Sequence, residues 1–329
     1  MNTKRWLALV VVVVLIFISI GFRFAINVAS GFFEDFADAF DPDNVEEYVI
    51  SDGDFMERIA IIELEGVIQG TENMWGLGYD HGLFLNMIEK AAEDTSIVGL
   101  IIRIDTPGGA VVETAQIHEA LLELQNEYDK PFYVSMGNTA ASGGYYVSAP
   151  ANKIFAESAT LTGSIGVIME SINFAELAEN YGVHFNTIKS GKHKDILSPS
   201  REMTNEEEQI LQSMIDEMYD EFVDVIVDGR GMSEDVVREL GDGRVYTGNQ
   251  AKENGLVDEV GSLKDTIEAM TEDYGLDDPQ IVQYDSFFGQ KLSVFGLNVQ
   301  KLFTGKQTEL DRVIELMQQS DKPRAMYIY

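Results

Sequence analysis

Apolar positions along the chain follow two spacings, and together these spacings predict alternating strands and helices. Short apolar runs of strand length stand at 59–64, 97–104, 131–135, 153–156, 165–169 and 184–188. Apolar residues at helical spacing stand at 82–94, 111–128, 173–181, 248–254 and 262–274, and a further helix starts after Ser233. Strands that alternate with helices indicate an α/β domain with a largely parallel sheet.

A long helix is expected to begin after Thr204. Thr204 and Glu207 have the spacing of a capping box, in which each side chain binds the backbone N–H of the other residue. The apolar stripe that should face the core consists of Ile210, Leu211, Met214, Met218, Phe222 and Val225.

The N-terminal residues carry the strongest apolar run of the chain. It extends from Trp6 to Phe22 and follows Lys4 and Arg5. We therefore expect a transmembrane anchor at 6–28 and a cytoplasmic tip at 1–5, with the rest of the chain outside the cell. The alternative is a cleaved secretory signal peptide. Against it, the run is longer than the usual hydrophobic region of such a peptide, and no clean cleavage site follows it.

The remaining chain divides by composition into three parts. Residues 29–57 contain many acidic side chains and no basic one, which indicates a solvated stalk. Residues 58–275 carry the alternating elements and form the expected α/β domain. Residues 276–329 form a C-terminal extension, with an expected helix at 309–318 and an apolar tail at 325–329. One hypothesis is that this tail enters the groove of a neighbouring copy as a self-substrate.

The charge balance argues against one class of partner. Fifty-six acidic residues face 23 basic ones, and the formal net charge of −33 repels the phosphate backbone of nucleic acids. The chain has no cysteine, which excludes disulfides, thiolate metal sites and a cysteine nucleophile. No spacing of histidine and carboxylate residues matches a metal motif, so we expect neither a metal nor another cofactor.

Two glycine-rich turns directly follow predicted strands. The first runs from Asp105 to Gly109 and opens a helix, whose first backbone N–H groups are able to hold an anion. Taken alone, it reads equally well as a simple connection. The second runs from 140 to 146 and places Ser142 before Gly143. The serine hydroxyl is then open, and the Gly143 N–H lies where an oxyanion would form during acyl transfer. The alternative is a packing turn of small residues.

Three lysines gather in a short segment of this acidic chain, at Lys189, Lys192 and Lys194. A lysine can act as the general base for a serine when burial lowers its pKa toward neutrality. A carboxylate beside the amine would favour the charged form instead, so we expect Asp195 to point away from Lys194. The alternative is a solvated basic loop.

Together these segments resemble the short, Gram-positive type of the signal peptide peptidase A family. The resemblance rests on the runs at 105–109, 140–146, 161–167, 189–195, 244–251 and 255–258. It covers nearly all of residues 59–271 together with the N-terminal anchor. Each motif alone is weak, but their combination is specific.

The resemblance implies a Clp-protease- or crotonase-like α/β fold, a spiral of ββα units. It implies assembly into a dome-shaped oligomer, an octamer, on the outer face of the membrane. The implied activity is that of a serine endopeptidase that degrades signal peptides left in the membrane after secretion. By residue match, Ser142 is the nucleophile, Lys194 the general base and Ser164 the residue that orients the lysine amine. Gly109 and Gly143 match the backbone donors of the oxyanion hole.

Three alternatives stay open on the sequence. A Ser-His-Asp triad would need a histidine, and no supporting motif surrounds any of the four, at His81, His118, His184 and His193. A membrane protease of the stomatin-associated type shares the serine–lysine pair, although the run at 140–146 fits it less well. The third alternative is a non-catalytic peptide-binding assembly module, against which the retention of both Ser142 and Lys194 argues.

Overall fold

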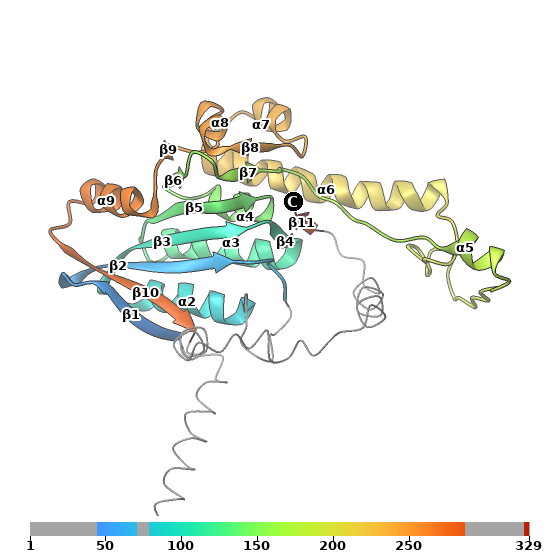
Figure 1. Cartoon of the computed structure of the whole chain (residues 1–329), viewed down its shortest axis with the longest axis horizontal. Coiled ribbons are helices and arrows are strands. Elements are labelled where there is room, and N and C mark those ends of the chain that lie inside the picture. Colours follow the sequence, from blue (N-terminus) through green and yellow to red (C-terminus); the bar gives the residue numbers. More distant parts are fainter. Residues whose placement is uncertain (1–44, 71–78, 287–325, 329) are drawn as a thin grey trace, which may run out of the picture. The chain divides into compact units, whose positions relative to one another are not determined.

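A mixed sheet of nine strands forms the centre of the computed structural model (Figure 1). The structure describes residues 45–70, 79–286 and 326–328, and all of them belong to one unit that begins at Val45. The strands are β1 (Val45–Ser51), β2 (Asp54–Glu65), β3 (Ile97–Thr106), β4 (Gly108–Ala110), β5 (Phe132–Ala141), β6 (Lys153–Ala156), β7 (Leu161–Gly163), β8 (Val245–Thr247), β9 (Glu259–Val260), β10 (Pro279–Ser286) and β11 (Met326–Ile328).

Parallel pairing joins the central strands in the order β10, β2, β3, β5, β6 and β9. β7 pairs in parallel with β5 and antiparallel with β8, and β4 and β11 form a separate two-stranded sheet. The helices are α2 (His81–Glu93), α3 (Val111–Asn126), α4 (Gly143–Ser148), α5 (Ala175–Asn180), α6 (Asn205–Arg230), α7 (Glu234–Leu240), α8 (Gly248–Glu253) and α9 (Leu263–Asp273).

Side chains are buried on both faces of the central strands. On one face, Ala60 and Ile62 of β2 belong to the main core, together with residues of α2, α3, α4 and α6. On the other face, Ile59 and Ile61 pack in a smaller core with Met270 of α9. Because both faces are covered, these strands read as continuous apolar runs. The predicted α/β class with a largely parallel sheet is confirmed.

The sheet is wider than the domain that the sequence delimits. β1 pairs antiparallel with β10, and β10 pairs in parallel with β2. Residues 45–57, expected in the stalk, and 279–286, expected in the C-terminal extension, therefore contribute strands to the domain. Most side chains of β1 are exposed or half-buried at the sheet edge. Its acidic residues are tolerated there, and they mask the strand in the sequence.

Two apolar runs that were expected as strands are not strands in the structure. Residues 165–169 contribute only an isolated bridge at Ile168, and residues 184–188 have no regular structure. In this region the strand is β7, which begins earlier. Ile168 and Phe185, one from each run, are 45% and 49% exposed. An apolar run forms a strand only where a neighbouring strand is available to pair with it.

The expected capping box at the start of α6 is confirmed. Thr204 Oγ1 accepts a hydrogen bond from the Glu207 N–H at 3.3 Å, and the Glu207 carboxylate accepts one from the Thr204 N–H at 3.1 Å. Replacing such a cap residue by alanine costs about 0.5–2 kcal/mol. The start of this helix is therefore fixed by its own sequence.

Only the C-terminal half of α6 belongs to the core. Phe222, Val223 and Ile226 are fully buried, whereas Ile210 and Met214 are 38% and 41% exposed. The apolar stripe expected along α6 is thus buried only in part. Figure 1 shows the reason: the N-terminal half of α6 extends past the sheet, and α5 lies near its far end.

The membrane prediction falls on residues that the structure does not describe. The expected tip and anchor at 1–28, the first part of the expected stalk and the expected helix at 309–318 lie outside the described residues. Within the described ranges, no helix combines the length and the apolar character that a membrane span requires.

Candidate active site

The carboxyl ends of three strands meet at one edge of the sheet, which we call the catalytic edge. β3 pairs with β5, and β5 with β7, up to their last residues. The glycine turn at 107–109, Ser142 and Ser164 follow these strand ends directly. In open parallel sheets, ligands bind at the carboxyl ends of strands. The fold therefore brings together four predicted site residues, namely Ser142, Ser164, Gly109 and Gly143.

Ser142 occupies a strained turn between β5 and α4. Its φ of 53° and ψ of −114° are rare for a residue with a side chain, and its N–H donates to the Gly163 carbonyl at 2.7 Å. The side chain is fully buried, and its Oγ has no hydrogen-bond partner among the described residues. An unsatisfied buried polar group costs about 1–3 kcal/mol. Strain and an unpaired hydroxyl together indicate a functional serine rather than a packing turn.

Backbone N–H groups of two glycines converge beside Ser142. Gly143 is the first residue of α4, and the first N–H groups of a helix have no partner within it. A Cβ built on Gly143 would lie 3.3 Å from the Gly109 nitrogen, so the two nitrogens are near each other. Two adjacent amide donors at a nucleophile are the arrangement that stabilises an oxyanion.

The chain's own C-terminal strand lies along this site. β11 pairs antiparallel with β4, with Tyr327 opposite Gly109. On its other side, Met326 exchanges two backbone hydrogen bonds with Ile168, at 3.0 and 3.1 Å. A single extended segment is thus held between two backbone edges. Residues 326–328 of the tail, for which the sequence suggested entry into a neighbouring copy, lie between two backbone edges of their own chain.

The carbonyl oxygen of Tyr327 and the nitrogen of Gly143 both lie close to Gly108. A Cβ built on Gly108 would lie only 2.1 Å from the Tyr327 carbonyl oxygen and 2.7 Å from the Gly143 nitrogen. Gly108 also has φ 102°, which L side chains rarely adopt. The turn requires glycine at 108 because a side chain there would come too close to both of these backbone atoms.

An aromatic pocket receives the fully buried side chain of Tyr327. The ring stacks on Tyr146 with 5.1 Å between centroids and lies tilted against Phe222 at 4.8 Å. Its hydroxyl donates to the Met218 carbonyl at 3.0 Å. Burial raises the pKa of this hydroxyl, which keeps it protonated as a donor. The pocket therefore fits an aromatic side chain of an extended peptide.

Ser164 lies next to Ser142 through the same turn. It follows Gly163, whose carbonyl binds the Ser142 N–H, and its own N–H donates to the Arg244 carbonyl at 2.8 Å. Its φ is 48°, and only 7% of its surface is exposed. A second strained serine is therefore fixed beside the nucleophile candidate.

Lys194 is not part of this arrangement within one chain. It lies between α5 and α6, in a segment that we call the arm, residues 170–204, none of which is buried. Its side chain is exposed, and its N–H donates to the Gly191 carbonyl at 3.3 Å. No hydrogen bond joins it to Ser142 in the part of the chain that the structure describes.

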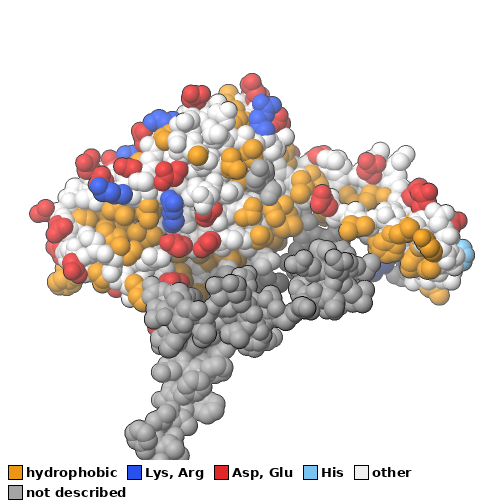
Figure 2. All heavy atoms as spheres, viewed as in Figure 1, with side chains coloured by type: hydrophobic (Ala, Val, Ile, Leu, Met, Phe, Trp, Pro, Cys, Tyr) orange, Lys and Arg blue, Asp and Glu red, His pale blue; other side chains and the backbone are white. Residues whose placement is uncertain are grey.

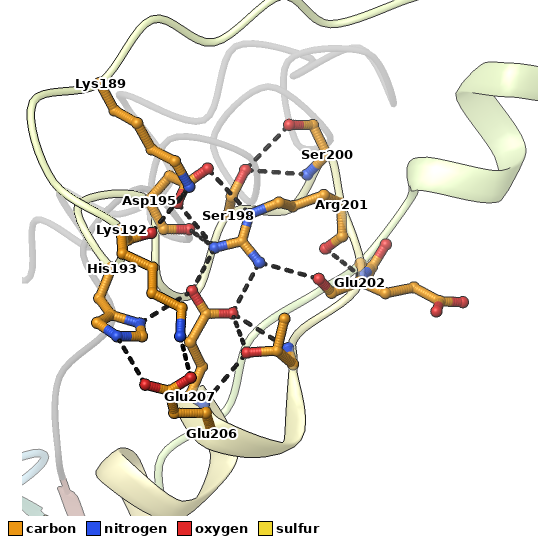
Figure 3. Close-up of polar contacts among 12 residues, drawn as sticks. Lys189, Lys192, His193, Asp195, Ser198, Ser200, Arg201, Glu202, Glu206 and Glu207 are labelled. Atoms are coloured by element: carbon orange, nitrogen blue, oxygen red, sulfur yellow. Dashed lines mark hydrogen bonds and ion pairs between the residues drawn. The ribbon is translucent and has the colours of Figure 1, made fainter.

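Asp195 turns toward other cations, as expected. Its carboxylate accepts hydrogen bonds from Arg201 and from the Lys189 amine (Figure 3). No ion pair between Asp195 and Lys194 occurs among the described residues. These contacts, with Arg201 first, lower the pKa of Asp195. The prediction that Asp195 points away from the lysine amine is confirmed.

The histidines do not support a catalytic triad. His118 packs edge-on against Tyr146, with 5.2 Å between ring centroids, and burial lowers its pKa. His193 lies near Glu206 and Glu207 in the first turn of α6. Within the described ranges, no histidine bonds the Ser142 hydroxyl, and no group of three or more histidine and carboxylate residues could hold a metal.

Sequence reasoning did not find the residues that form the peptide groove. Tyr146 stands inside the serine motif, and Phe222 and Met218 stand in the stripe of α6, where periodicity predicts only that they are buried. Ile168 was expected inside a strand. Their common role depends on contacts between segments far apart in the chain, which no local spacing encodes.

Comparisons with known proteins show the family to which this chain belongs. A family model described as Peptidase family S49 matches residues 125–277. A protein of Enterococcus faecium named "Putative signal peptide peptidase SppA" is 37% identical over 292 residues, which cover 87% of this chain and 85% of that protein. A protein of Synechocystis sp., also named as a protease, is 43% identical over 197 residues, or 60% of this chain and 70% of that protein.

One solved structure also resembles this chain. It is a serine-to-alanine mutant of the 1510-N membrane-bound stomatin-specific protease. The TM-score is 0.41 at 13% sequence identity, and the match covers 64% of this chain and 84% of that one.

Proposed function

Since this chain belongs to the signal peptide peptidase A family, peptidase family S49, we propose that it is a membrane-anchored serine endopeptidase with a serine–lysine dyad. Ser142 is the nucleophile, Lys194 the general base and Ser164 the residue that orients the amine. Gly109 and Gly143 donate to the oxyanion. The units of the sheet form a spiral of the Clp-protease or crotonase type.

One observation carries this proposal: an extended peptide, β11, already lies along the catalytic edge. Its backbone pairs with β4, its aromatic side chain fills the pocket of Tyr146 and Phe222, and its carbonyl lies beside the Gly143 nitrogen. Addition of a strand to an exposed edge is a general way to bind peptides, because main-chain bonds accept many sequences and pockets select side chains.

The chemistry consists of two acyl transfers. The Ser142 hydroxyl gives its proton to the neutral Lys194 amine while its oxygen bonds to the substrate carbonyl carbon. The carbonyl oxygen becomes an oxyanion held by the amides of Gly109 and Gly143. The C–N bond then breaks, and the Lys194 ammonium protonates the leaving amine. Water next gives a proton to Lys194 while its oxygen bonds to the acyl carbon. The bond between that carbon and Ser142 Oγ then breaks, the Lys194 ammonium returns the proton to Ser142 Oγ, and the acid product leaves.

The dyad requires a second copy of the chain. Lys194 is exposed on the arm, while the Ser142 hydroxyl is buried and has no partner within the described ranges. The arm also exposes large apolar side chains, namely Ile172, Leu177, Tyr181, Val183, Phe185 and Ile188. Figure 2 shows a cluster of hydrophobic side chains at this end of the unit. A patch of this kind marks an interaction surface, so in a homo-oligomer the arm of one copy covers the catalytic edge of the next and desolvates Lys194.

The substrates are signal peptides left in the membrane after secretion. Their apolar, extended segments suit a groove that is lined by aromatic rings and backbone edges. The anchor at 6–28 holds the N-terminus in the cytoplasm and the catalytic domain on the outer face of the cell membrane, in a dome-shaped oligomer of about eight copies by family resemblance. The net charge of −33 leaves nucleic acids unsuited as partners.

A complementation assay tests both the dyad and its division between copies. The full chain in detergent is given an internally quenched peptide of sequence Ala-Met-Tyr-Ile-Tyr. Ser142→Ala and Lys194→Ala should each lose all activity above background while remaining folded and assembled. Mixed oligomers of the two variants should regain part of it, because some sites then combine an intact serine with an intact lysine.

Two results would contradict the proposal in different ways. Substantial activity of Lys194→Ala would show that the base is another group. Two inactive variants that exchange subunits but recover no activity would place serine and lysine of each site in the same chain.

A further inference from the structure

The arm carries an ion-pair cluster directly beside the proposed base. Arg201 binds the Asp195 carboxylate at two points, through Nε at 2.9 Å and an amino group at 2.8 Å, and the same amino group donates to the Asp195 carbonyl at 3.0 Å. Arg201 also binds both oxygens of Glu207, at 2.6 and 2.8 Å. Figure 3 shows the guanidinium between the two carboxylates. Two-point contacts of this kind fix direction as well as distance.

The cluster links the Lys194 backbone to the rigid part of the molecule. Asp195 follows Lys194 in the chain, and Glu207 closes the capping box at the start of α6. The other half of α6 supplies Phe222 and the Met218 carbonyl to the peptide pocket. Arg201 thus connects the loop of the base to the helix that also lines the substrate pocket.

The cluster also controls the charges around the amine. The charged groups of this loop and of the first turn of α6 are Lys189, Lys192, His193, Asp195, Arg201, Glu202, Glu206, Glu207 and Glu208. Lys189 and Arg201 bind Asp195, and Lys192 binds Glu206. His193 lies within 3.3–3.6 Å of Glu206 and Glu207. Among these carboxylates, Asp195 is the one adjacent in sequence to the base, and its oxygens are directed to Arg201 and Lys189.

We propose that Arg201 is a positioning residue for Lys194: it holds Asp195 against the start of α6, which fixes the loop of the base and keeps the adjacent carboxylate away from the amine. This inference rests on the proposed function, in which Lys194 must be neutral to accept the Ser142 proton. An unpaired carboxylate within about 4–6 Å favours the charged form of an amine by roughly one to three pH units. The cluster prevents that contact.

The pH dependence of peptide cleavage tests the proposal. kcat/KM of the full chain in detergent is measured with the peptide Ala-Met-Tyr-Ile-Tyr, which carries a fluorophore and a quencher. The measurement runs from about pH 5 to about pH 10, roughly the range in which a perturbed lysine base titrates. In Arg201→Gln, Asp195 loses its two-point contact and keeps only the Lys189 amine. Its carboxylate is then able to turn to Lys194, so the acid limb should move upward by about one pH unit. At a pH well below the pKa that sets this limb, raising that pKa by one unit lowers kcat/KM about tenfold.

A second substitution separates this role from a merely structural one. In Arg201→Gln/Asp195→Asn the freed carboxylate is gone, so the acid limb should return to the wild-type pH, although the plateau stays lower because the loop is less well fixed. Arg201→Lys keeps the charge but lacks the two-point geometry. It should show a smaller upward shift, and it supplies the same test if Arg201→Gln does not fold.

The matched control is Arg238→Gln. Arg238 also binds two carboxylates at the surface of α6 and α7, those of Asp220 and Glu234, but it lies outside the arm. Its removal should leave the acid limb unchanged. A folded and assembled Arg201→Gln with an unshifted acid limb would overturn the inference. If that result accompanies an inactive Lys194→Ala, only this inference fails. An active Lys194→Ala would instead overturn the proposed function itself.

Discussion

The catalytic edge and the arm are built by different forces. At the catalytic edge, backbone pairing of β3, β5 and β7 and the buried core fix Ser142, which is fully enclosed. In the arm no residue is buried, and ion pairs around Arg201 take the place of a core. A nucleophile is thus positioned by packing and a proposed base by charge. The position of Ser142 should therefore tolerate changes of pH and salt, whereas the position of Lys194 should respond to them.

The two halves of α6 give the largest expected contrast. Phe222→Ala empties a fully buried site and should lower the free energy of unfolding by about 3–5 kcal/mol. Met214→Ala, at a position that is 41% exposed on the same helix, should change it by about 0.5 kcal/mol or less. Denaturant unfolding of the full chain in detergent, followed by circular dichroism, measures both. Equal losses would show that the arm side of α6 is packed as tightly as the core.

Glycines with positive φ in the two regions offer the next contrast. Gly108→Ala places a Cβ between the peptide carbonyl and the Gly143 nitrogen, which should lower kcat by about 10²–10³-fold, as loss of an oxyanion donor does. Gly182 in the arm has φ 73°, and a Cβ built there meets no atom of the described residues within 4 Å. Gly182→Ala should therefore lower only the free energy of unfolding, by the backbone strain of about 1–2 kcal/mol.

Peptide cleavage by both alanine variants, with circular dichroism as the check on folding, measures this contrast. The assignment of the catalytic edge would be contradicted if a folded Gly108→Ala cleaved the peptide as fast as Gly182→Ala does.

The same division explains what the sequence could predict. The serine turn, the double-glycine turn and the capping box of Thr204 are local patterns, and the structure has each where the sequence predicts it. Continuous apolar runs correctly indicated the central strands, because those strands are buried on both faces. The sequence did not predict β1, because a strand at the edge of a sheet needs no apolar pattern.

The groove and the arm required information that local patterns do not contain. The pocket joins Tyr146, Phe222 and Tyr327, which meet only through the fold. In the arm, the apolar run 184–188 was expected to be a strand, yet Phe185 and Ile188 are exposed, and no strand of the described residues pairs with this run. Apolar periodicity predicts which side chains are buried. It does not distinguish burial in the core of one chain from burial in an interface between two chains.

The smallest expected effect is a loosening of the arm in acid. Arg201, as the main cause, lowers the pKa of Glu207 from 4.5 to about 2. A carboxyl whose pKa is depressed by folding stabilises the folded form above its unfolded pKa, and that stabilisation is lost as pH falls through the folded value. Between about pH 4.5 and 2 the Glu207 contacts should therefore weaken. Protection of backbone amides from hydrogen exchange, taken relative to the intrinsic exchange rate at each pH, should then fall in the arm before it does in β5.

Substitution at the start of α6 identifies the group responsible for this loosening. The glutamine of Glu207→Gln cannot ionise. Backbone amides of the arm should therefore be less protected from hydrogen exchange already at neutral pH, and their protection, relative to the intrinsic rate, should change little between about pH 4.5 and 2. Salt should act on the wild type in the same direction as acid but more weakly, since the Glu207 side chain is buried and salt screens buried charge pairs less than exposed ones. If protection from exchange changed with pH in the same way in the arm and in β5, packing rather than charge would hold both regions, and the distinction between them would be lost.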